Sequence, residues 1–322
     1  MIEQVFKDIY KIEIPLPNSP LRATNSYFIK GDSRNLIVDT GFNHPVCKAA
    51  MDDALKRLGF SMHNTDLFIT HIHSDHSGLA GSLAQPETKV YCGKYCAELL
   101  TGQADLAKYG KDYMLQSGLV VNSRLHYDMA LNSARVANAN PVSDGDSIKV
   151  GEFTLRCIDT TGHAPDHMCL YDLERKILFS GDHILESITP NNTIWELPWS
   201  VTTDTLGTYL TNLDKIAELE INRVFPGHRG IINDCRQRID ELKIHHAQRL
   251  EQIMGIIGGE KMNGAEVAGR MTWNVGKKSW EQFSSFRKIL CTGEALAHLS
   301  HLVFIKKLKK ELLNGVVFYM KE

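Results

Sequence analysis

Short stretches in which apolar and polar residues alternate recur between residues 5 and 179, and this pattern predicts β-strands. The expected strands are 5–14, 26–30, 36–39, 89–92, 148–150, 153–158, 168–171 and 176–179. Apolar residues spaced three and four apart predict helices at 46–58 and at 203–219. Pro45 marks the start of the first helix and Gly59 its end. Strands that alternate with helices indicate the α/β fold class.

Two further regions lack this alternation. The pattern of 94–140 is polar and helical, which predicts a helical insertion. Residues 234–257 predict one long helix ended by Gly258, and beyond it 264–271, 279–290 and 293–302 predict helices, followed by a hairpin of 311–313 and 316–320. We therefore expect a catalytic domain at 1–235, a connector helix at 236–259 and a winged-helix-like domain at 260–322.

The composition is that of an ordinary globular protein. Of the 322 residues, 43% are hydrophobic and 23% are charged, which is sufficient for a sizeable core. No apolar run reaches the roughly 18 residues that a membrane span needs, and the first residues lack a signal-peptide pattern, so we expect a cytoplasmic protein without membrane contact. The seven cysteines are odd in number and scattered, which argues against a disulfide framework.

Charge is distributed unevenly along the chain. Residues 261–322 contain eleven Lys and Arg against five Glu, although the whole chain has a net charge of -2. Four of these lysines lie within 306–310, where they could contact nucleic-acid phosphates or an acidic face of a second subunit in a homodimer. The simpler explanation is a lysine-rich helix end, which complements the helix dipole and keeps the surface soluble. Both kinds of partner remain hypotheses.

Candidate chemistry is concentrated just after the apolar residues 67–69. The run from His71 through His73 and Asp75 to His76 places three imidazoles and a carboxylate within six residues. His71 and His73 alternate, so they project to the same side of a strand end, while Asp75 and His76 belong to the following turn. Packing explains this run poorly, because neighbouring histidines repel when protonated. Two groups of ligands predict two metal ions.

Three later segments end in a similar way. Each is an apolar run followed by Gly and then by His163, Asp182 or His228. Glycine allows the backbone to turn sharply and to approach an ion without a side-chain clash. We therefore expect three strands that each deliver one further ligand.

This series of motifs resembles the metallo-β-lactamase superfamily of binuclear hydrolases, over residues 39–228. The resemblance implies a four-layer αββα sandwich. It implies that one ion binds His71, His73 and His163, that the other binds Asp75, His76 and His228, and that Asp182 bridges them. Asp39, in Val38-Asp39-Thr40-Gly41, matches a strand-end Asp that lies near the site in this family. The C-terminal region resembles the module of a branch distantly related to glyoxalase II.

Several residues outside the ligand set are candidates for supporting roles. His167 and His183 lie beside predicted ligands and could orient a ligand or contact substrate, while Asp39 or Asp166 could accept a hydrogen bond from a ligating imidazole. Tyr127 in the insertion and the two tryptophans Trp195 and Trp199 are candidates for pocket walls. The alternatives are packing of a peripheral helical hairpin and anchoring of the tryptophan loop.

The predicted chemistry is hydrolysis. A water held between two divalent cations is a hydroxide near neutral pH, and Asp75 is expected to act as the catalytic residue that holds its ion and this nucleophile in line. Zinc is the metal we expect, although His/Asp shells also accept iron or manganese. The first hypothesis for the substrate is a small thioester, ester or lactone.

Two alternatives differ in class. One is a metal-dependent phosphodiesterase or endoribonuclease that acts on single-stranded RNA, and the other is a non-catalytic metal-containing regulatory protein. Departures from known branches also constrain the substrate. The β-lactamases lack the bridging carboxylate that Asp182 supplies, and glyoxalase II enzymes have Glu-Tyr where this chain has Arg229-Gly230. Antibiotics and glutathione thioesters are therefore disfavoured as substrates.

Overall fold

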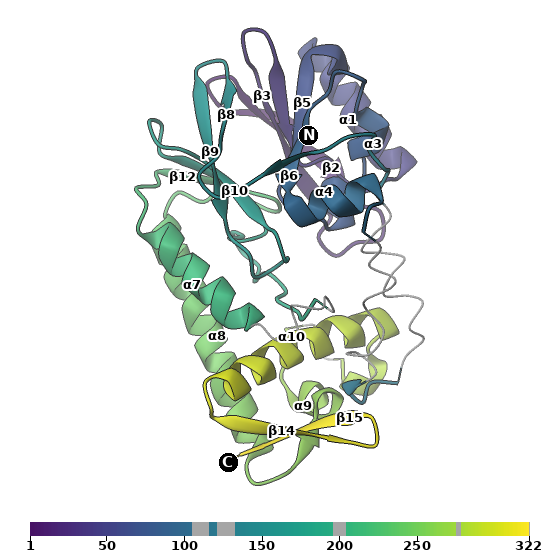
Figure 1. Ribbon diagram of the computed structural model, residues 1–322, viewed down its shortest axis with the longest axis vertical. Coiled ribbons are helices and arrows are strands. Elements are labelled where there is room, and N and C mark those ends of the chain that lie inside the picture. The colour runs from purple at the N-terminus through teal and green to yellow at the C-terminus, as the bar shows by residue number, and fades with distance from the viewer. Residues whose placement is uncertain (105–115, 121–132, 196–203, 275–277, 322) are drawn as a thin grey trace. The chain divides into compact units, whose positions relative to one another are not determined.

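The computed structural model describes residues 1–104, 116–120, 133–195, 204–274 and 278–321 (Figure 1). The chain divides into two compact units. The described part of the first unit comprises 1–104, 133–190 and 212–239, and that of the second comprises 116–120, 191–195, 204–211, 240–274 and 278–321. No helix in these described ranges combines the length and apolar character that crossing a bilayer requires.

The first unit contains a seven-stranded sheet whose strands follow chain order. The strands are β1 (Ile2–Phe6), β2 (Ile9–Pro15), β3 (Ala23–Ile29), β4 (Asn35–Val38), β5 (Thr65–Ile69), β6 (Val90–Gly93) and β7 (Asn140–Val142). Strands β1 to β4 pair antiparallel, whereas β4 to β7 pair parallel. The carboxyl ends of β4, β5 and β6 therefore lie at the same edge of this sheet.

Helices join the parallel strands of this sheet. They are α1 (Pro45–Leu58) and the 3-10 turn η1 (Met62–Asn64) before β5, then α2 (Ser74–Ser77) and α3 (Ala80–Leu83), and then α4 (Lys94–Thr101) after β6. The His44 side chain accepts a hydrogen bond from the Val46 amide at the start of α1, and Gly59 ends the helix with φ of 72°. Both ends lie where the sequence predicts them, because Pro at the first turn and Gly after the last are strong helix boundaries.

A second sheet of five strands belongs to the same unit. Its order is β12 (Arg223–Pro226), β11 (Ile177–Gly181), β10 (Met168–Asp172), β9 (Phe153–Asp159) and β8 (Ser147–Val150). Strands β11 and β12 are parallel, so their carboxyl ends also lie together. The stretch 5–14, expected as a single strand, is two strands, because the chain turns at Asp8 with φ of 60°.

The inner faces of the two sheets form one core. Tyr27 from β3 contacts both Phe179 and Phe225 of the second sheet, with each ring centroid 5.4 Å away. Phe68 and Leu170 belong to the same buried cluster. Helices α1, α3 and α4 lie along the outer side of the seven-stranded sheet (Figure 1). This is the α/β arrangement, two packed sheets with flanking helices, that the sequence predicts.

The second unit is largely helical and contains a small sheet. Its elements are the end of α8 (Cys235–Ile257), β13 (Met262–Asn263), α9 (Gly264–Arg270), η3 (Trp280–Gln282), α10 (Ser285–Phe304), β14 (Leu308–Leu313) and β15 (Val316–Lys321), with the start of α7 (Thr205–Ala217). The sheet has the order β13-β15-β14. The predicted hairpin is therefore present, and its first strand begins earlier than expected.

Two details of this unit differ from expectation. The predicted helices 279–290 and 293–302 are one continuous helix from Ser285 onward, so the break expected near Gly293 is wrong. A Cβ at Gly293 would collide with the Thr193 hydroxyl, so this glycine permits close packing rather than ending a helix. Lys309 and Lys310 lie on strand β14, an exposed edge strand, and not at a helix end.

Candidate metal centre

The seven side chains predicted as metal ligands come together within the first unit. His71 and His73 follow β5, and Asp75 and His76 lie on the single-turn helix α2 rather than in an irregular turn. His163, Asp182 and His228 follow β9, β11 and β12. Six of the seven are buried and His73 is partly buried. Both sheets thus deliver side chains to one place at the ends of their strands.

The donor atoms form two triads that could each hold a metal ion. In the first, His73 Nδ1 lies 2.8 Å from His71 Nε2 and 3.0 Å from His163 Nε2. In the second, Asp75 Oδ2 lies 3.3 Å from His228 Nε2 and 3.8 Å from His76 Nε2. Imidazole nitrogens and carboxylate oxygens are the usual ligands of zinc and related divalent cations.

Asp182 lies between these triads. Its Oδ1 is 3.4 Å from His76 Nε2, and its Oδ2 is 3.5 Å from His228 Nε2 and 3.7 Å from His163 Nε2. Among the described residues, Asp182 Oδ1 and the Nε2 atoms of His76 and His228 are buried and make no hydrogen bond. Leaving a buried polar atom without a hydrogen bond costs about 1–3 kcal/mol. Bound cations would satisfy all three atoms, so the donor set fits metal ions.

The electrostatics of the cluster are also those of a cation site. Burial, followed by the neighbouring histidines, holds the pKa of His71 well below its usual range and lowers that of His73 to about 3, so both imidazoles are neutral. Burial raises the pKa of Asp75, but His76 and His228 outweigh it and bring the value to about 2. Burial lowers the pKa of His76 and His228 too, but Asp182 and Asp75 outweigh it and raise both values, that of His228 to about 10. The two carboxylates thus attract positive charge at this place, which bound divalent cations would supply.

Asp39 and Thr70 connect ligands of both triads. The His76 Nδ1–H donates to Asp39 Oδ2 at 2.7 Å, and the Thr70 amide donates to Asp39 Oδ1 at 2.9 Å. The Thr70 hydroxyl also donates to Asp39, 2.8 Å from Oδ2, and can therefore accept the N–H of His71 Nδ1 at 3.0 Å. One carboxylate thus orients His76 directly and His71 through Thr70. Such partners fix the tautomer and orientation of a ligating imidazole.

Replacing Thr70 with Val should weaken metal binding by roughly tenfold, because the valine methyl cannot accept from His71 or donate to Asp39. Thr70→Ser keeps the hydroxyl and should restore most of the affinity. Competition with a chromophoric chelator measures both variants without reference to activity. Equal affinity in Thr70→Val and wild-type protein would show that the hydroxyl does not orient His71.

His167 holds the backbone of Asp182. Its Nε2 accepts the Asp182 amide N–H at 3.1 Å, so its Nδ1 carries the proton and donates to the Thr160 hydroxyl at 2.8 Å. His183 is buried beside His167, with 6.1 Å between ring centroids, and burial lowers its pKa to about 3. The geometry thus gives His167 a positioning contact with a predicted ligand.

Asp166 has a different position from the one expected beside a ligating imidazole. Its Oδ2 accepts from the Cys96 amide in the first turn of α4, and its Oδ1 is buried without a hydrogen bond to any described residue. Burial raises the pKa of Asp166 to about 7, and the Cys96 amide only partly opposes this effect. The side chain therefore caps a helix end.

The raised pKa of Asp166 predicts a pH-dependent stability. Between about pH 4, where an unfolded Asp ionises, and pH 7 the folded state retains a proton that the unfolded state has lost. The stability contribution is thus complete below pH 4 and declines as the pH rises to 7, by at most about 4 kcal/mol. Asp166→Asn should narrow the difference in unfolding free energy between pH 5 and pH 8, while Asp53→Asn, on an exposed helix face, should not. An unchanged difference in Asp166→Asn would contradict this reasoning.

Strand β3 supplies supporting residues that the sequence analysis missed. Thr24 Oγ1 donates to the Asp75 carbonyl at 2.8 Å, and the Asn25 amide group donates to the Pro226 carbonyl at 3.0 Å. His228 Nδ1–H donates to the Ala23 carbonyl at 2.7 Å. The available signal was the polar triplet at 24–26 within a strand that is otherwise apolar, because buried polar residues need specific partners.

The predicted pocket walls fall outside this cluster or outside the described ranges. Tyr127 and Trp199 lie outside the described residues, as does most of the predicted insertion beyond α4. Trp195 is half-buried in the second unit. The residues before it anchor the loop there, since Ile194 belongs to the core of that unit and Asn192 faces His246 at 3.4 Å. A role for Trp195 in substrate binding stays a prediction.

Two packed sheets with His/Asp clusters at their strand ends define an α/β fold with a centre that could bind metal ions. The model of the metallo-beta-lactamase superfamily matches residues 19–228. The chain belongs to this superfamily and is one of its hydrolases.

Comparison with curated proteins gives distant relatives. The chain is 25% identical over 281 residues to lactamase-like protein adaB of Aspergillus niger. This alignment covers 84% of this chain and 72% of that protein. It is 28% identical to beta-lactamase-like protein 2 homolog of Caenorhabditis elegans, and this alignment covers 74% of this chain and 66% of that protein. It is 24% identical to the atrochrysone carboxyl ACP thioesterase of Aspergillus fumigatus, and this alignment covers 80% of this chain and 50% of that protein. The chain thus spans between half and about three quarters of the length of these relatives.

Solved structures share the fold along the whole chain. A metallo-beta-lactamase family protein from Thermus thermophilus has a TM-score of 0.84 at 25% identity, covering 99% of this chain and all of that one. A beta-lactamase domain protein from Burkholderia ambifaria has a TM-score of 0.82 at 24% identity, covering 100% of this chain and 95% of that one. The C-terminal unit is therefore part of the shared fold.

Proposed function

We propose that this hydrolase is binuclear and that it cleaves a small thioester, ester or lactone. The position of Asp182 carries this proposal, because its two oxygens reach ligands of both triads at 3.4 to 3.7 Å. A carboxylate shared in this way supports two ions rather than one. We propose zinc for both positions, since imidazole nitrogens and carboxylate oxygens suit it, with iron or manganese as alternatives.

The residues of the site support hydrolysis without a side-chain nucleophile. Two divalent ions held by these residues would supply Lewis acidity and lower the pKa of a bound water toward neutrality. Asp75 stays ionised with its pKa near 2, so it can accept a hydrogen bond from an attacking water and orient it. A cysteine nucleophile is disfavoured because the seven cysteines are buried, and burial raises the pKa of Cys157 and Cys169 to about 12.

A thioester is the favoured substrate within this class. The support comes from the relative named as an atrochrysone carboxyl ACP thioesterase, of which the chain spans half. We further propose that 260–322 is a winged-helix-like module of the glyoxalase II-like branch, supported by the order of β13, α9, α10 and the hairpin β14-β15. The exposed lysines of β14 by themselves support no second function.

A substrate panel tests this proposal. Acyl thioester, aryl ester, lactone and single-stranded RNA are offered to wild-type protein of known metal content, to His71→Ala and to His63→Ala. His63 is exposed and lies outside the cluster, so its variant controls for loss of a histidine. We expect thioester or ester hydrolysis that disappears only in His71→Ala. RNA cleavage lost in His71→Ala, with no turnover of the small substrates, would replace the proposal with a nuclease.

A further inference from the structure

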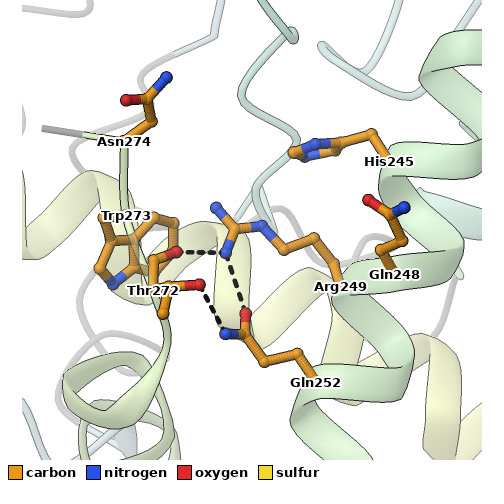
Figure 2. A pocket seen from close by; sticks show the side chains of 7 residues that line it. All are labelled: His245, Gln248, Arg249, Gln252, Thr272, Trp273 and Asn274. Atoms are coloured by element: carbon orange, nitrogen blue, oxygen red, sulfur yellow. Dashed lines mark hydrogen bonds between the residues drawn. The ribbon is translucent and has the colours of Figure 1, made fainter.

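The second unit contains a pocket of its own, lined by residues to which no role has been assigned so far. Its volume is about 450 Å³. Helix α8 and the segment that follows α9 line it with His245, Gln248, Arg249, Gln252, Thr272, Trp273 and Asn274 (Figure 2). Pockets for small molecules typically measure about 300–1,000 Å³. The cavity is therefore large enough for a small organic ligand.

Arg249 is held rigidly in the wall of this pocket. One terminal nitrogen, Nη1, donates to the Thr272 carbonyl at 2.5 Å and to Gln252 Oε1 at 3.1 Å. Gln252 in turn donates to the Thr272 hydroxyl at 2.7 Å. The guanidinium carbon lies 4.5 Å from the centre of the Trp273 ring. These contacts fix the plane of the guanidinium before any ligand arrives.

The other terminal nitrogen of Arg249 remains available. Nη2 makes no hydrogen bond to the described residues, and Figure 2 shows this end of the guanidinium turned away from Gln252 and Thr272, toward the open space between Asn274 and His245. Arginine presents its N–H groups in a planar fork that matches the oxygens of carboxylates and phosphates. An oxyanion is the ligand group that this end would bind.

The charge of the pocket agrees with an anionic ligand. The described lining residues include Arg249 and no carboxylate. Glu294, which does not line the pocket, pairs with Arg249 at 3.4 Å between Oε1 and Nε, and both side chains are only 14% exposed. Burial raises the pKa of Glu294, and the Arg249 charge partly opposes this effect. On its pocket side Arg249 thus presents N–H donors, flanked by the neutral amide groups of Gln248 and Asn274.

We propose that this pocket binds a small organic oxyanion, a carboxylate or phosphate attached to a partly apolar body. Arg249 binds the oxyanion, Gln248 and Asn274 donate further hydrogen bonds, and the Trp273 ring provides an apolar wall. A merely structural arginine would explain the contacts to Thr272 and Gln252. It would not explain the free guanidinium edge facing a cavity whose described lining lacks a carboxylate.

Calorimetric titration of the full-length, metal-loaded protein tests this assignment. The probes are phenyl phosphate and benzoate, which separate phosphate from carboxylate, and phenol, which lacks the charge. Gln248→Glu places a carboxylate at an exposed position of the rim and should weaken oxyanion binding by roughly tenfold, while Arg249→Gln should abolish it. Ala247→Glu makes the same charge change on the same helix at an exposed residue that does not line the pocket, and should bind like wild type.

The binding affinities of the wild type and the variants show whether the oxyanion binds in this pocket. Binding of either oxyanion that is weakened in Gln248→Glu and kept in Ala247→Glu supports the pocket, and the preferred probe identifies the ligand class. Binding that is equal in wild type, Gln248→Glu and Arg249→Gln belongs elsewhere, for instance at the metal centre, and overturns the proposal. The absence of binding by both oxyanions also overturns it. Because Gln248 is exposed, its variant stays informative even if Arg249→Gln fails to fold.

Discussion

Asp182→Asn is expected to lower kcat/KM at least 100-fold and to reduce the bound metal from two ions toward one. Asn has the shape of Asp without its charge, so the fold should persist while the bridge is lost. Asp182 Oδ1 and Oδ2 reach His76 and His228, and no neutral amide can balance the repulsion between two nearby cations. A loss of 100-fold corresponds to about 2.7 kcal/mol of transition-state stabilisation.

Metal analysis and kinetics on the same preparation test this expectation. Glu186→Gln serves as the matched control, because it also converts a carboxylate to an amide but at an exposed residue after the same strand. It should retain both ions and full activity. If Asp182→Asn held a single ion and still turned over at the wild-type rate, the binuclear mechanism would be wrong.

Gly227→Ala should be nearly as damaging, although it adds only one methyl group. A Cβ at this position would lie 2.6 Å from Asp182 Oδ1 and 2.6 Å from His76 Cε1, closer than any normal contact. Both neighbours are proposed metal ligands, and their buried side chains have little freedom to move. We expect at least a 100-fold loss of activity, together with weakened metal binding, because displacement of about 1 Å at a reacting centre has effects of this size.

Gly230→Ala provides the comparison three residues later. A Cβ there would meet the Glu186 side chain at 3.5 Å, which is an ordinary contact, so this variant should behave like wild type. Circular dichroism and thermal unfolding of both variants separate a local clash from global unfolding. Normal metal affinity in Gly227→Ala would mean that the loop after β12 shifts without disturbing Asp182 or His76.

The clustering of the seven predicted ligands follows from local sequence patterns. His71 to His76 are contiguous, and His163, Asp182 and His228 each follow an apolar run and a glycine, so local patterns mark them. The prediction of a break in α10 was wrong, because a glycine that permits close packing against Thr193 looks in sequence like a glycine that ends a helix. The local pattern cannot distinguish these two uses.

Residues whose roles depend on distant partners were harder to predict. Thr70 looks like a strand residue until Asp39 approaches it from the neighbouring strand, and Thr24 acquires its role only through the Asp75 carbonyl. Arg249 is an ordinary helix-surface arginine in the sequence, and its fixed position arises from Trp273 and Thr272. Such roles require tertiary contacts that no local pattern encodes.

The origin of the ligands in both sheets has a consequence for folding. His71 to His76 come from the seven-stranded sheet, whereas His163, Asp182 and His228 come from the five-stranded sheet. The donor set is therefore assembled only after the two sheets have packed, and contacts between such distant segments form late. A chelator present during refolding should leave the rate of chain compaction unchanged and affect only the final step, in which the folded protein takes up its ions.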